Sequence, residues 1–234
     1  MKRSNKLAYR NPETRRRLRV AFIVLAFSCL LLASCVPQIQ PEKPNFERLS
    51  LDDALAQYKK ISSINTVLGI EYEKNGGVMQ GDGSLIISRD KLSLRINYLG
   101  FLQGEITEEK GEVKSKPKID RNKSDLLVNG LKSSLFWWNI NDYVRTETDD
   151  SYELRNNTRK VVIDKQSLLP VEQTIELENG DELVITYGRP AQRLTEDGRG
   201  IDADSPLGWY PGRLNIQLRN YVVRITVKSY EITR

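Results

Sequence analysis

Residues 91–110 read KLSLRINYLGFLQGEITEEK, and this stretch decides which kind of fold the chain adopts. Its first eight residues alternate between apolar and polar side chains, and the apolar ones are Leu92, Leu94, Ile96 and Tyr98. A period of two places these four side chains on one face, as in a β-strand that is buried on one side only. The run from 103 to 119 predicts a hairpin that turns at Lys110 and Gly111. The stretch therefore predicts consecutive antiparallel strands.

The connection between these strands, residues 97–104, is unusually apolar. Connecting loops are normally short and polar, but this one carries Leu99, Phe101 and Leu102 around Gly100. One interpretation is an ordinary bulge whose apolar side chains face inward. The other is an exposed loop that inserts into a lipid or partner surface. The sequence is compatible with both.

Two amphipathic helices are expected. Ser50 and Asp53 form a capping box, and apolar residues recur at helical spacing from there to Ile61. A second helix is predicted over 123–141, with Ser124 as its cap. Its apolar residues are Leu126, Leu127, Leu131, Leu135, Phe136, Trp137 and Trp138. The tryptophan pair fits a place in the core, and it equally fits the wall of an apolar pocket under a helical cover.

The rest of the chain alternates with a period of two. A hairpin is predicted around Asn75 and Gly76, and two further strands flank Arg219 and Asn220 at the end of the chain. Between them, strands are predicted at 143–148, 151–156, 159–165, 169–178 and 181–188, followed by an irregular loop at 189–211. Eleven or twelve antiparallel strands with two helices predict one α+β, mostly β domain, in which a highly curved sheet has helices on one side.

The first 47 residues predict export and a lipid anchor. Residues 1–34 combine a basic start, an apolar run and two small residues, which is the layout of a secretory signal peptide. The run is shorter than the roughly 20 residues of a membrane-spanning helix, although a buried helix or an uncleaved anchor also fits. Leu32-Ala33-Ser34-Cys35 resembles a bacterial lipobox, which implies cleavage before Cys35 and its modification with acyl chains such as palmitate. Residues 35–47 then form a lipidated, proline-containing tether.

Charge and residue types exclude several classes of protein. The first 34 residues carry eight basic side chains and one acidic one, so residues 35–234 have a net charge of −2, and we expect no nucleic-acid binding. Without histidine and with two cysteines, no imidazole or thiolate metal site and no cofactor are expected. The neighbouring carboxylates at 108–109 and 149–150 point to opposite faces of a strand, so we interpret them as solvated surface. We therefore expect that the chain is not an enzyme.

Three further stretches carry a resemblance to a known family. INYLGFLQGEI (96–106) is similar to a strand–loop–strand segment of the LolA/LolB lipoprotein-sorting family, and GDELVITYG (180–188) and YPGRLNIQLRNYVVRITVKSYEI (210–232) are similar to its last strands. The resemblance covers most of residues 48–234. It implies a half-barrel of about eleven strands with a helical lid over an apolar cavity for acyl chains.

The resemblance also implies roles for particular residues. Leu99 matches a protruding loop leucine that assists delivery to the membrane, and Arg95 matches an arginine that bonds to the lid. Tyr98 stands where the family has a proline, and the 189–211 loop is longer. The membrane- or cargo-inserting loop is expected to contain Leu99, Phe101 and Leu102, and the cavity or lid is expected to contain Leu94, Arg95, Ile96, Phe136, Trp137 and Trp138.

Together these features predict an outer-membrane lipoprotein, since Val36 after the cysteine directs sorting to that membrane in enterobacterial-type systems. It would bind lipoprotein acyl chains as a chaperone in protein transport and receive them from a LolA-like periplasmic carrier. The alternatives are a scaffolding lipoprotein that binds a protein partner, a carrier of another lipid, and a hydrolase.

Overall fold

A computed structural model describes residues 44–46, 48–195 and 198–234, which belong to one compact unit. The predicted signal peptide 1–34, Cys35 and nearly all of the tether lie outside these residues. At the end of the tether, Pro44 and Phe46 are buried, and the Phe46 amide donates a hydrogen bond of 2.7 Å to the Gln166 carbonyl. The folded unit thus begins before residue 48. No helix in the part of the chain that the structure describes has the length and apolarity to cross a membrane.

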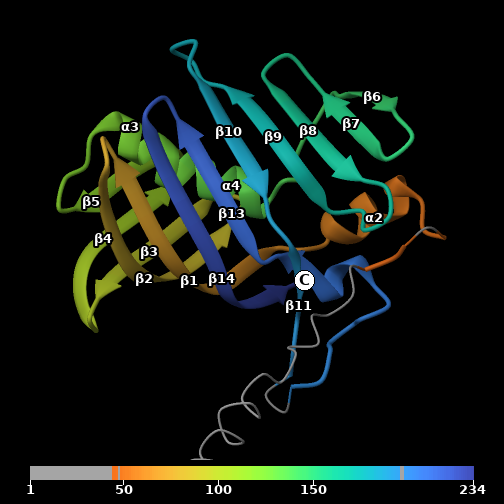
Figure 1. The fold of residues 1–234 in the computed structure, drawn as a ribbon, viewed down its shortest axis with the longest axis horizontal. Coiled ribbons are helices and arrows are strands. Elements are labelled where there is room, and N and C mark those ends of the chain that lie inside the picture. The colour runs from red at the N-terminus through yellow and green to blue at the C-terminus, as the bar shows by residue number, and fades with distance from the viewer. Residues whose placement is uncertain (1–43, 47, 196–197) are drawn as a thin grey trace, which may run out of the picture. The chain divides into compact units, whose positions relative to one another are not determined.

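A twelve-stranded antiparallel sheet dominates the fold (Figure 1). Its strands follow the order β5-β4-β3-β2-β1-β14-β13-β10-β9-β8-β7-β6. In chain order they are β1 (Ser63–Lys74), β2 (Gly77–Ser88), β3 (Lys91–Tyr98), β4 (Phe101–Glu109), β5 (Glu112–Lys116), β6 (Val144–Glu147), β7 (Ser151–Arg155), β8 (Arg159–Asp164), β9 (Pro170–Glu176), β10 (Glu182–Tyr187), β13 (Arg213–Leu218) and β14 (Tyr221–Thr233). Because β5 and β6 stand at opposite ends of this order, the sheet is not closed into a barrel. The prediction of a single, highly curved, open sheet is confirmed.

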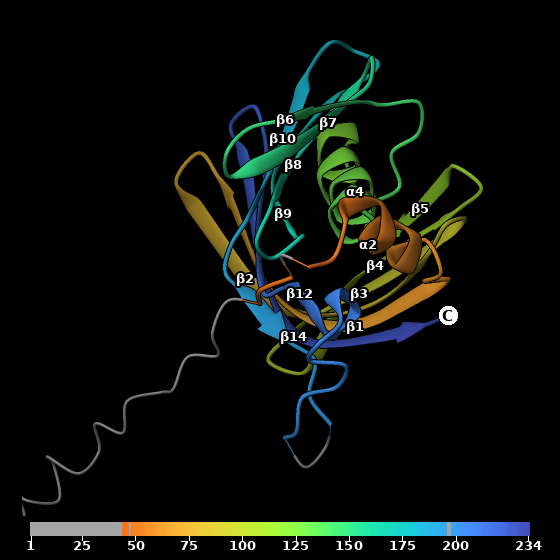
Figure 2. The same ribbon diagram turned by 90° about the vertical axis from the view of Figure 1, so that its right-hand side faces the viewer.

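The helices lie inside the curve of this sheet (Figure 2). They are α2 (Leu51–Tyr58) and a continuous helical segment made of α3 (Arg121–Ser124), the π-helical turn η1 (Asp125–Asn129) and α4 (Gly130–Leu135). This segment connects β5 to β6, the two edges of the sheet. A chain that passes from one edge to the other must cross a face of the sheet, and here it crosses the concave face, which we call the inner face.

The alternation of the sequence explains which side chains form the core. In β3, Leu92 and Leu94 are fully buried on the inner face, whereas Lys91 and Arg95 are exposed on the outer face. In β14, Val223 is likewise buried between more exposed neighbours. Apolar residues of α2 and of the helical segment complete the same core. One continuous core therefore fills most of the half-barrel, and burial of this apolar surface drives folding.

The helix termini agree with the prediction at α2 but not at the second helix. At α2, the Ser50 hydroxyl accepts a hydrogen bond of 3.1 Å from the Asp53 amide, as the capping box requires. The second helix starts at Arg121 rather than after Ser124, because Asp120 Oδ1 caps it by accepting from the Lys123 amide at 2.9 Å. It ends at Leu135, since Phe136 leaves helical geometry with φ −110° and ψ 45°.

Residues 189–211 are not simply an irregular loop, as the sequence suggested. They contain β11 (Pro190–Gln192), the 3₁₀ turn η2 (Pro206–Gly208) and β12 (Trp209–Pro211), and β11 pairs with β12. The Tyr58 hydroxyl donates to the Pro206 carbonyl at 3.1 Å, so this segment is tied to α2. The short apolar run Pro206–Trp209 is buried, and its Leu207 and Trp209 belong to the core.

Candidate functional site

An apolar cavity of about 700 Å³ lies between the inner face of strands β1–β4 and the helical segment. Its wall includes Ile70 of β1, Ile96 of β3 and Ile106 of β4, and Leu127 of η1 faces them. The volume falls within the range of roughly 300–1,000 Å³ that small-molecule sites occupy. Chains of CH₂ groups gain free energy when such surfaces remove them from water. The geometry therefore suits a ligand with an alkyl part.

Two glycines on the inner face explain why this part of the half-barrel is hollow. Gly81 and Gly104 line the cavity and leave no side chain in it. At Gly81 an added Cβ would lie 2.7 Å from the Asn97 carbonyl oxygen, so only glycine fits there. At Gly104 the nearest atom to an added Cβ is the Lys116 carbonyl oxygen at 3.4 Å, an ordinary contact distance. A larger side chain at Gly104 would thus extend into the cavity.

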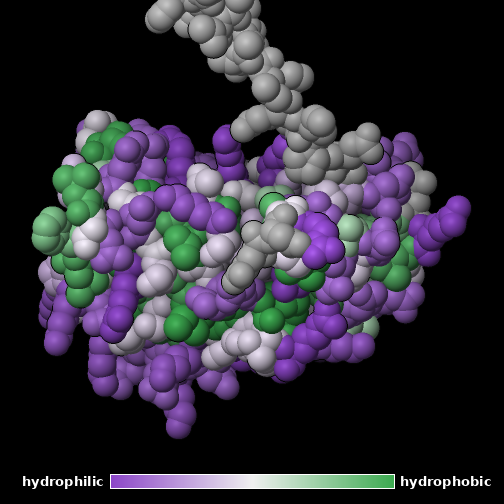
Figure 3. Space-filling view, turned by 90° about the horizontal axis from the view of Figure 1, so that it is seen from below, coloured by the Kyte–Doolittle hydropathy of each residue, from purple (hydrophilic) through white to green (hydrophobic). Residues whose placement is uncertain are grey.

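The β3–β4 hairpin ends in an exposed apolar group that we call the hairpin tip: Tyr98, Leu99, Phe101 and Leu102. Leu99 is 80% exposed and Phe101 72%, so the structure exposes these side chains instead of turning them inward. Tyr98 also lines the cavity. Figure 3 shows apolar side chains gathered where this hairpin lies, at the left of the face it draws. An apolar tip thus stands directly beside an apolar cavity.

The backbone of the hairpin tip is strained. Leu99 has φ +49° and Gly100 φ +81°, the left-handed pair of a two-residue type I′ turn. Such turns favour Asn-Gly, and this chain uses Asn75-Gly76 at the β1–β2 turn with φ +50° and +80°. A leucine in this conformation costs roughly 1–2 kcal/mol. Because Leu99 lowers stability in this conformation and is exposed, we infer that it serves a purpose other than stabilising the fold.

The residues predicted for the lid form a buried aromatic cluster. Trp138 stacks on Tyr58 of α2 with ring centroids 4.9 Å apart, and Trp137 meets the same ring edge-on at 5.0 Å. Phe136 packs on Trp138 at 5.3 Å. All four side chains are buried, and burial raises the pKa of the Tyr58 hydroxyl well above its ordinary value. The cluster joins α2 to the end of the helical segment and does not line the cavity.

Arg159 of β8 holds the same helix end and was missed by sequence reasoning. Its Nη2 donates to the carbonyls of Ser133 and Trp137 at 3.1 and 3.2 Å and to Gln173 Oε1 at 2.7 Å, and its Nη1 donates to the Asn139 carbonyl at 2.9 Å. The pKa of the guanidinium lies below its ordinary value because burial disfavours its charge. Carbonyls at a helix end lack partners within the helix and attract a cation. Arg159 therefore clamps the helical segment to β8 and β9.

Glu108 provides a second clamp, and it corrects the prediction that Glu108 and Glu109 are both solvated surface. Glu109 is exposed, but Glu108 is only 5% exposed on the inner face, where its carboxylate accepts a hydrogen bond from Lys132 Nζ of α4 at 2.7 Å. Its other oxygen accepts from the Gly111 amide at 2.8 Å. The helical segment is thus attached to β4 as well as to β8.

Comparisons with known proteins add to this picture. No family model and no curated protein matches the sequence. Among solved structures, the chain is similar to a LolA superfamily protein from Nitrosomonas europaea, with a TM-score of 0.50, 10% identity and coverage of 80% of this chain and 94% of that one.

The chain has the LolA-like fold. A DUF1329 family protein from Desulfovibrio piger is also similar, with 14% identity, coverage of 78% of this chain and 90% of that one, and a TM-score of 0.46. A putative outer membrane lipoprotein-sorting protein domain from Vibrio parahaemolyticus has 11% identity, coverage of 79% and 94%, and a TM-score of 0.42. The fold rests on the Nitrosomonas protein, and at 10% identity that likeness concerns the fold alone.

Within this LolA-like fold, the three β3 residues predicted for the cavity lie in three different places. Ile96 lines the cavity, whereas Leu94 is fully buried in the core. Arg95 does not face the cavity or the helices. Its side chain is 62% exposed on the outer face, where its Nε donates to Glu105 on β4 at 3.2 Å. The strand alternation itself separates Arg95 from Leu94 and Ile96. The expectation that Arg95 bonds to the lid is therefore wrong.

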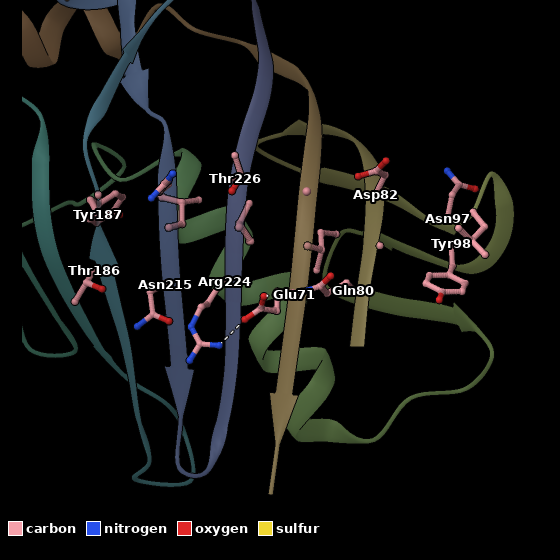
Figure 4. A pocket seen from close by; sticks show the side chains of 18 of the residues that line it. Glu71, Gln80, Asp82, Asn97, Tyr98, Thr186, Tyr187, Asn215, Arg224 and Thr226 are labelled. Carbon is pink, nitrogen blue, oxygen red and sulfur yellow. Dashed lines mark hydrogen bonds and ion pairs between the residues drawn. The ribbon is translucent and has the colours of Figure 1, made fainter. Parts of the chain in front are cut away.

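The outer face of the LolA-like sheet carries a second hollow, of about 980 Å³ (Figure 4). Its lining is rich in polar residues, several of which are held in ion pairs. Within the lining, Arg224 pairs with Glu71 at 2.6 Å. Arg224 also pairs with Glu73 at 2.8 Å, and Asp82 of the lining pairs with Lys228 at 2.6 Å; Glu73 and Lys228 lie outside the lining. Figure 4 shows the Arg224–Glu71 pair in the middle of this groove. Such a lining does not suit an alkyl chain, so the inner cavity is the candidate site.

Asp125 makes stability of the helical segment depend on pH. Burial raises the pKa of its carboxyl, although Arg121 and Asn129 oppose this. Above its folded-state pKa, Asp125 is ionised, and burial of this charge lowers the free energy of unfolding. The cost decreases as the pH falls through that pKa, and it is absent below the ordinary pKa of about 3.9. Asp125→Asn should raise the free energy of unfolding by roughly 0.5 kcal/mol at pH 7 and less near pH 4. Urea unfolding at both pH values tests this, with Asp90→Asn at an exposed position as the control; an equal gain at both would contradict it.

Proposed function

We propose that this chain binds acyl chains of lipids or lipoproteins in its inner cavity and takes part in moving them to a membrane, without catalysing a reaction. The observation that carries the proposal is the apolar cavity with an apolar hairpin tip beside it. An acyl chain is costly to expose to water, at about 0.8 kcal/mol for each CH₂ group. A carrier therefore needs apolar walls, and it needs a surface that touches the donor or acceptor membrane.

The cellular role we propose is that of an outer-membrane lipoprotein that accepts other lipoproteins and inserts them into that membrane. Cys35 would anchor the chain, and a periplasmic carrier with the same fold would be its donor. Transfer between two such cavities needs only a difference in affinity. The lipobox-like residues and the LolA-like fold support this role.

Two measurements test these proposals separately. Native mass spectrometry of residues 35–234, with Cys35→Ala to keep the chain's own anchor out of the cavity, should detect bound fatty acid or phospholipid. Depletion of the protein from the cell should leave other lipoproteins in the periplasm or the inner membrane. A chain with no bound lipid that co-purifies with an envelope complex would support the scaffolding alternative, for which the outer groove offers a polar surface. Normal lipoprotein sorting on depletion would refute the receptor role.

Leu99→Asn is expected to weaken binding to phosphatidylcholine vesicles about tenfold, since a buried leucine contributes roughly 1.5–3 kcal/mol. The fold should be unharmed, because Asn favours the left-handed conformation that Leu99 adopts. Lys110→Asn is the matched control, because Lys110 has φ +52° at the same position of the β4–β5 turn. Co-sedimentation with vesicles and thermal unfolding of both variants provide the test. If both variants bind vesicles alike, the hairpin tip does not insert.

A further inference from the structure

One lysine side chain stands at an otherwise uncharged cavity. Among the described residues that line it, the charged ones are Lys123, in α3, and Lys116, at the end of β5. Lys116 is opposite Glu105 in the register, so its side chain lies on the outer face with Arg95, and Lys123 is the charged side chain on the cavity side. The remaining lining is apolar or neutral, with Gln80 and Gln103 as its amides. The acids of the outer groove, such as Glu71 and Asp82, lie on the other face of the sheet. The cavity thus combines an alkyl-binding wall with positive charge alone.

The position of Lys123 shows where that charge acts. Its Nζ lies 5.8 Å from the centre of the Tyr72 ring, and Tyr72 is a wall residue on β1. The ammonium therefore projects toward the wall of the cavity, where the ring face attracts it. Asp120 is the nearest carboxylate in an ion pair with Lys123, but at 4.0 Å, with both side chains well exposed, it compensates the charge weakly.

We infer that the cavity takes an amphiphile with an anionic head group, a carboxylate or a phosphate, which Lys123 holds while its alkyl chain lies along Ile70, Ile96 and Ile106. This inference rests on the proposed acyl-chain function and names the class of cargo. Hydrogen bonds between charged groups are roughly twice as strong as neutral ones. A lipoprotein N-terminus that is fully acylated carries no charge and would gain nothing from this lysine.

Calorimetric titration of residues 35–234 with Cys35→Ala tests the inference, using three amphiphiles with the same chain length of twelve carbons below their micelle concentrations. Laurate and dodecyl phosphate carry an anionic head, and dodecyl maltoside is neutral. We expect the anionic pair to bind about tenfold more tightly than the maltoside, and less so at high salt. The ratio between laurate and dodecyl phosphate tells a carboxylate from a phosphate head.

Lys123→Met should abolish this preference and leave the maltoside affinity within about twofold, since Lys123 lies at the cavity surface. Lys116→Met removes the same charge from the outer face of β5, and it should retain the preference. Equal affinity for all three amphiphiles, or a preference that survives in Lys123→Met, would overturn the inference alone. Failure of every amphiphile to bind would overturn the proposed function with it.

Discussion

Arg159→Met is expected to lower the free energy of unfolding by about 3 kcal/mol. The variant keeps most of the apolar stem but leaves the carbonyls of Ser133, Trp137 and Asn139 without the donor that now satisfies them. Buried polar groups without partners cost roughly 1–3 kcal/mol each, and this applies to the part-buried bonds to Ser133 and Trp137, since the bond to Asn139 is exposed. The loss should be concentrated in the helical segment, because the strand partners of β8 keep their own hydrogen bonds.

Urea unfolding and amide hydrogen exchange measure the two parts of this expectation. Arg155→Met is the control, since Arg155 pairs with Lys160 in the same hairpin but is exposed. Protection should fall in residues 121–139 and persist in β1 and β14. An unchanged free energy of unfolding would show that Arg159 does not clamp the helix end. A uniform loss of protection would make it a general core contact instead.

Gly104→Phe is expected to weaken acyl-chain binding at least tenfold. Gly104 lies opposite Ile96 on the inner face, so the aromatic ring would occupy space that an alkyl chain needs. The fold should tolerate the change, because an added Cβ meets no atom closer than 3.4 Å and phenylalanine favours strands. The free energy of unfolding should stay within about 1 kcal/mol of the parent value.

Thr107→Phe is the matched control, because it adds the same ring to the outer face of the same strand. Laurate titration of both variants should show lost binding at Gly104→Phe and parent affinity at Thr107→Phe. Parent affinity in both would mean that lipid is held elsewhere. If Gly104→Ala lowers the laurate affinity by an intermediate amount, the ligand lies close to the backbone of β4.

Much of the sheet was predictable because its alternation is local. Leu92, Leu94 and Ile96 marked the inner face of β3, and the Asn75-Gly76 and Lys110-Gly111 turns marked the hairpins. The same alternation held the signal for the two clamps. Arg159 shares a face with Val161 and Ile163, and Glu108 shares one with Ile106, so both charges point to the inner face, where Glu108 is buried and Arg159 half-buried.

What the sequence could not supply were the partners of these charges. Lys132 lies 24 positions from Glu108, and the carbonyls around Arg159 lie 20 to 26 positions away, so the contacts exist only once the helical segment crosses the sheet. The expectation for Arg95 is wrong for the opposite reason. It rests on the resemblance to a family, whereas the alternation of apolar and polar residues in β3 places Arg95 on the outer face. The order within residues 189–211 depends on contacts with α2, which lies far away in the chain.

The pairing of β1 with β14 sets the order in which the molecule can be completed. These strands are neighbours in the middle of the sheet, with Lys74 opposite Tyr221 and Ser63 opposite Thr233. During synthesis, β1 leaves the ribosome long before its partner, so one side of it stays without hydrogen bonds until the last residues are made. Contacts of such long sequence separation slow folding. A chain that pairs its first and last strands therefore cannot complete its sheet until β14 has been made.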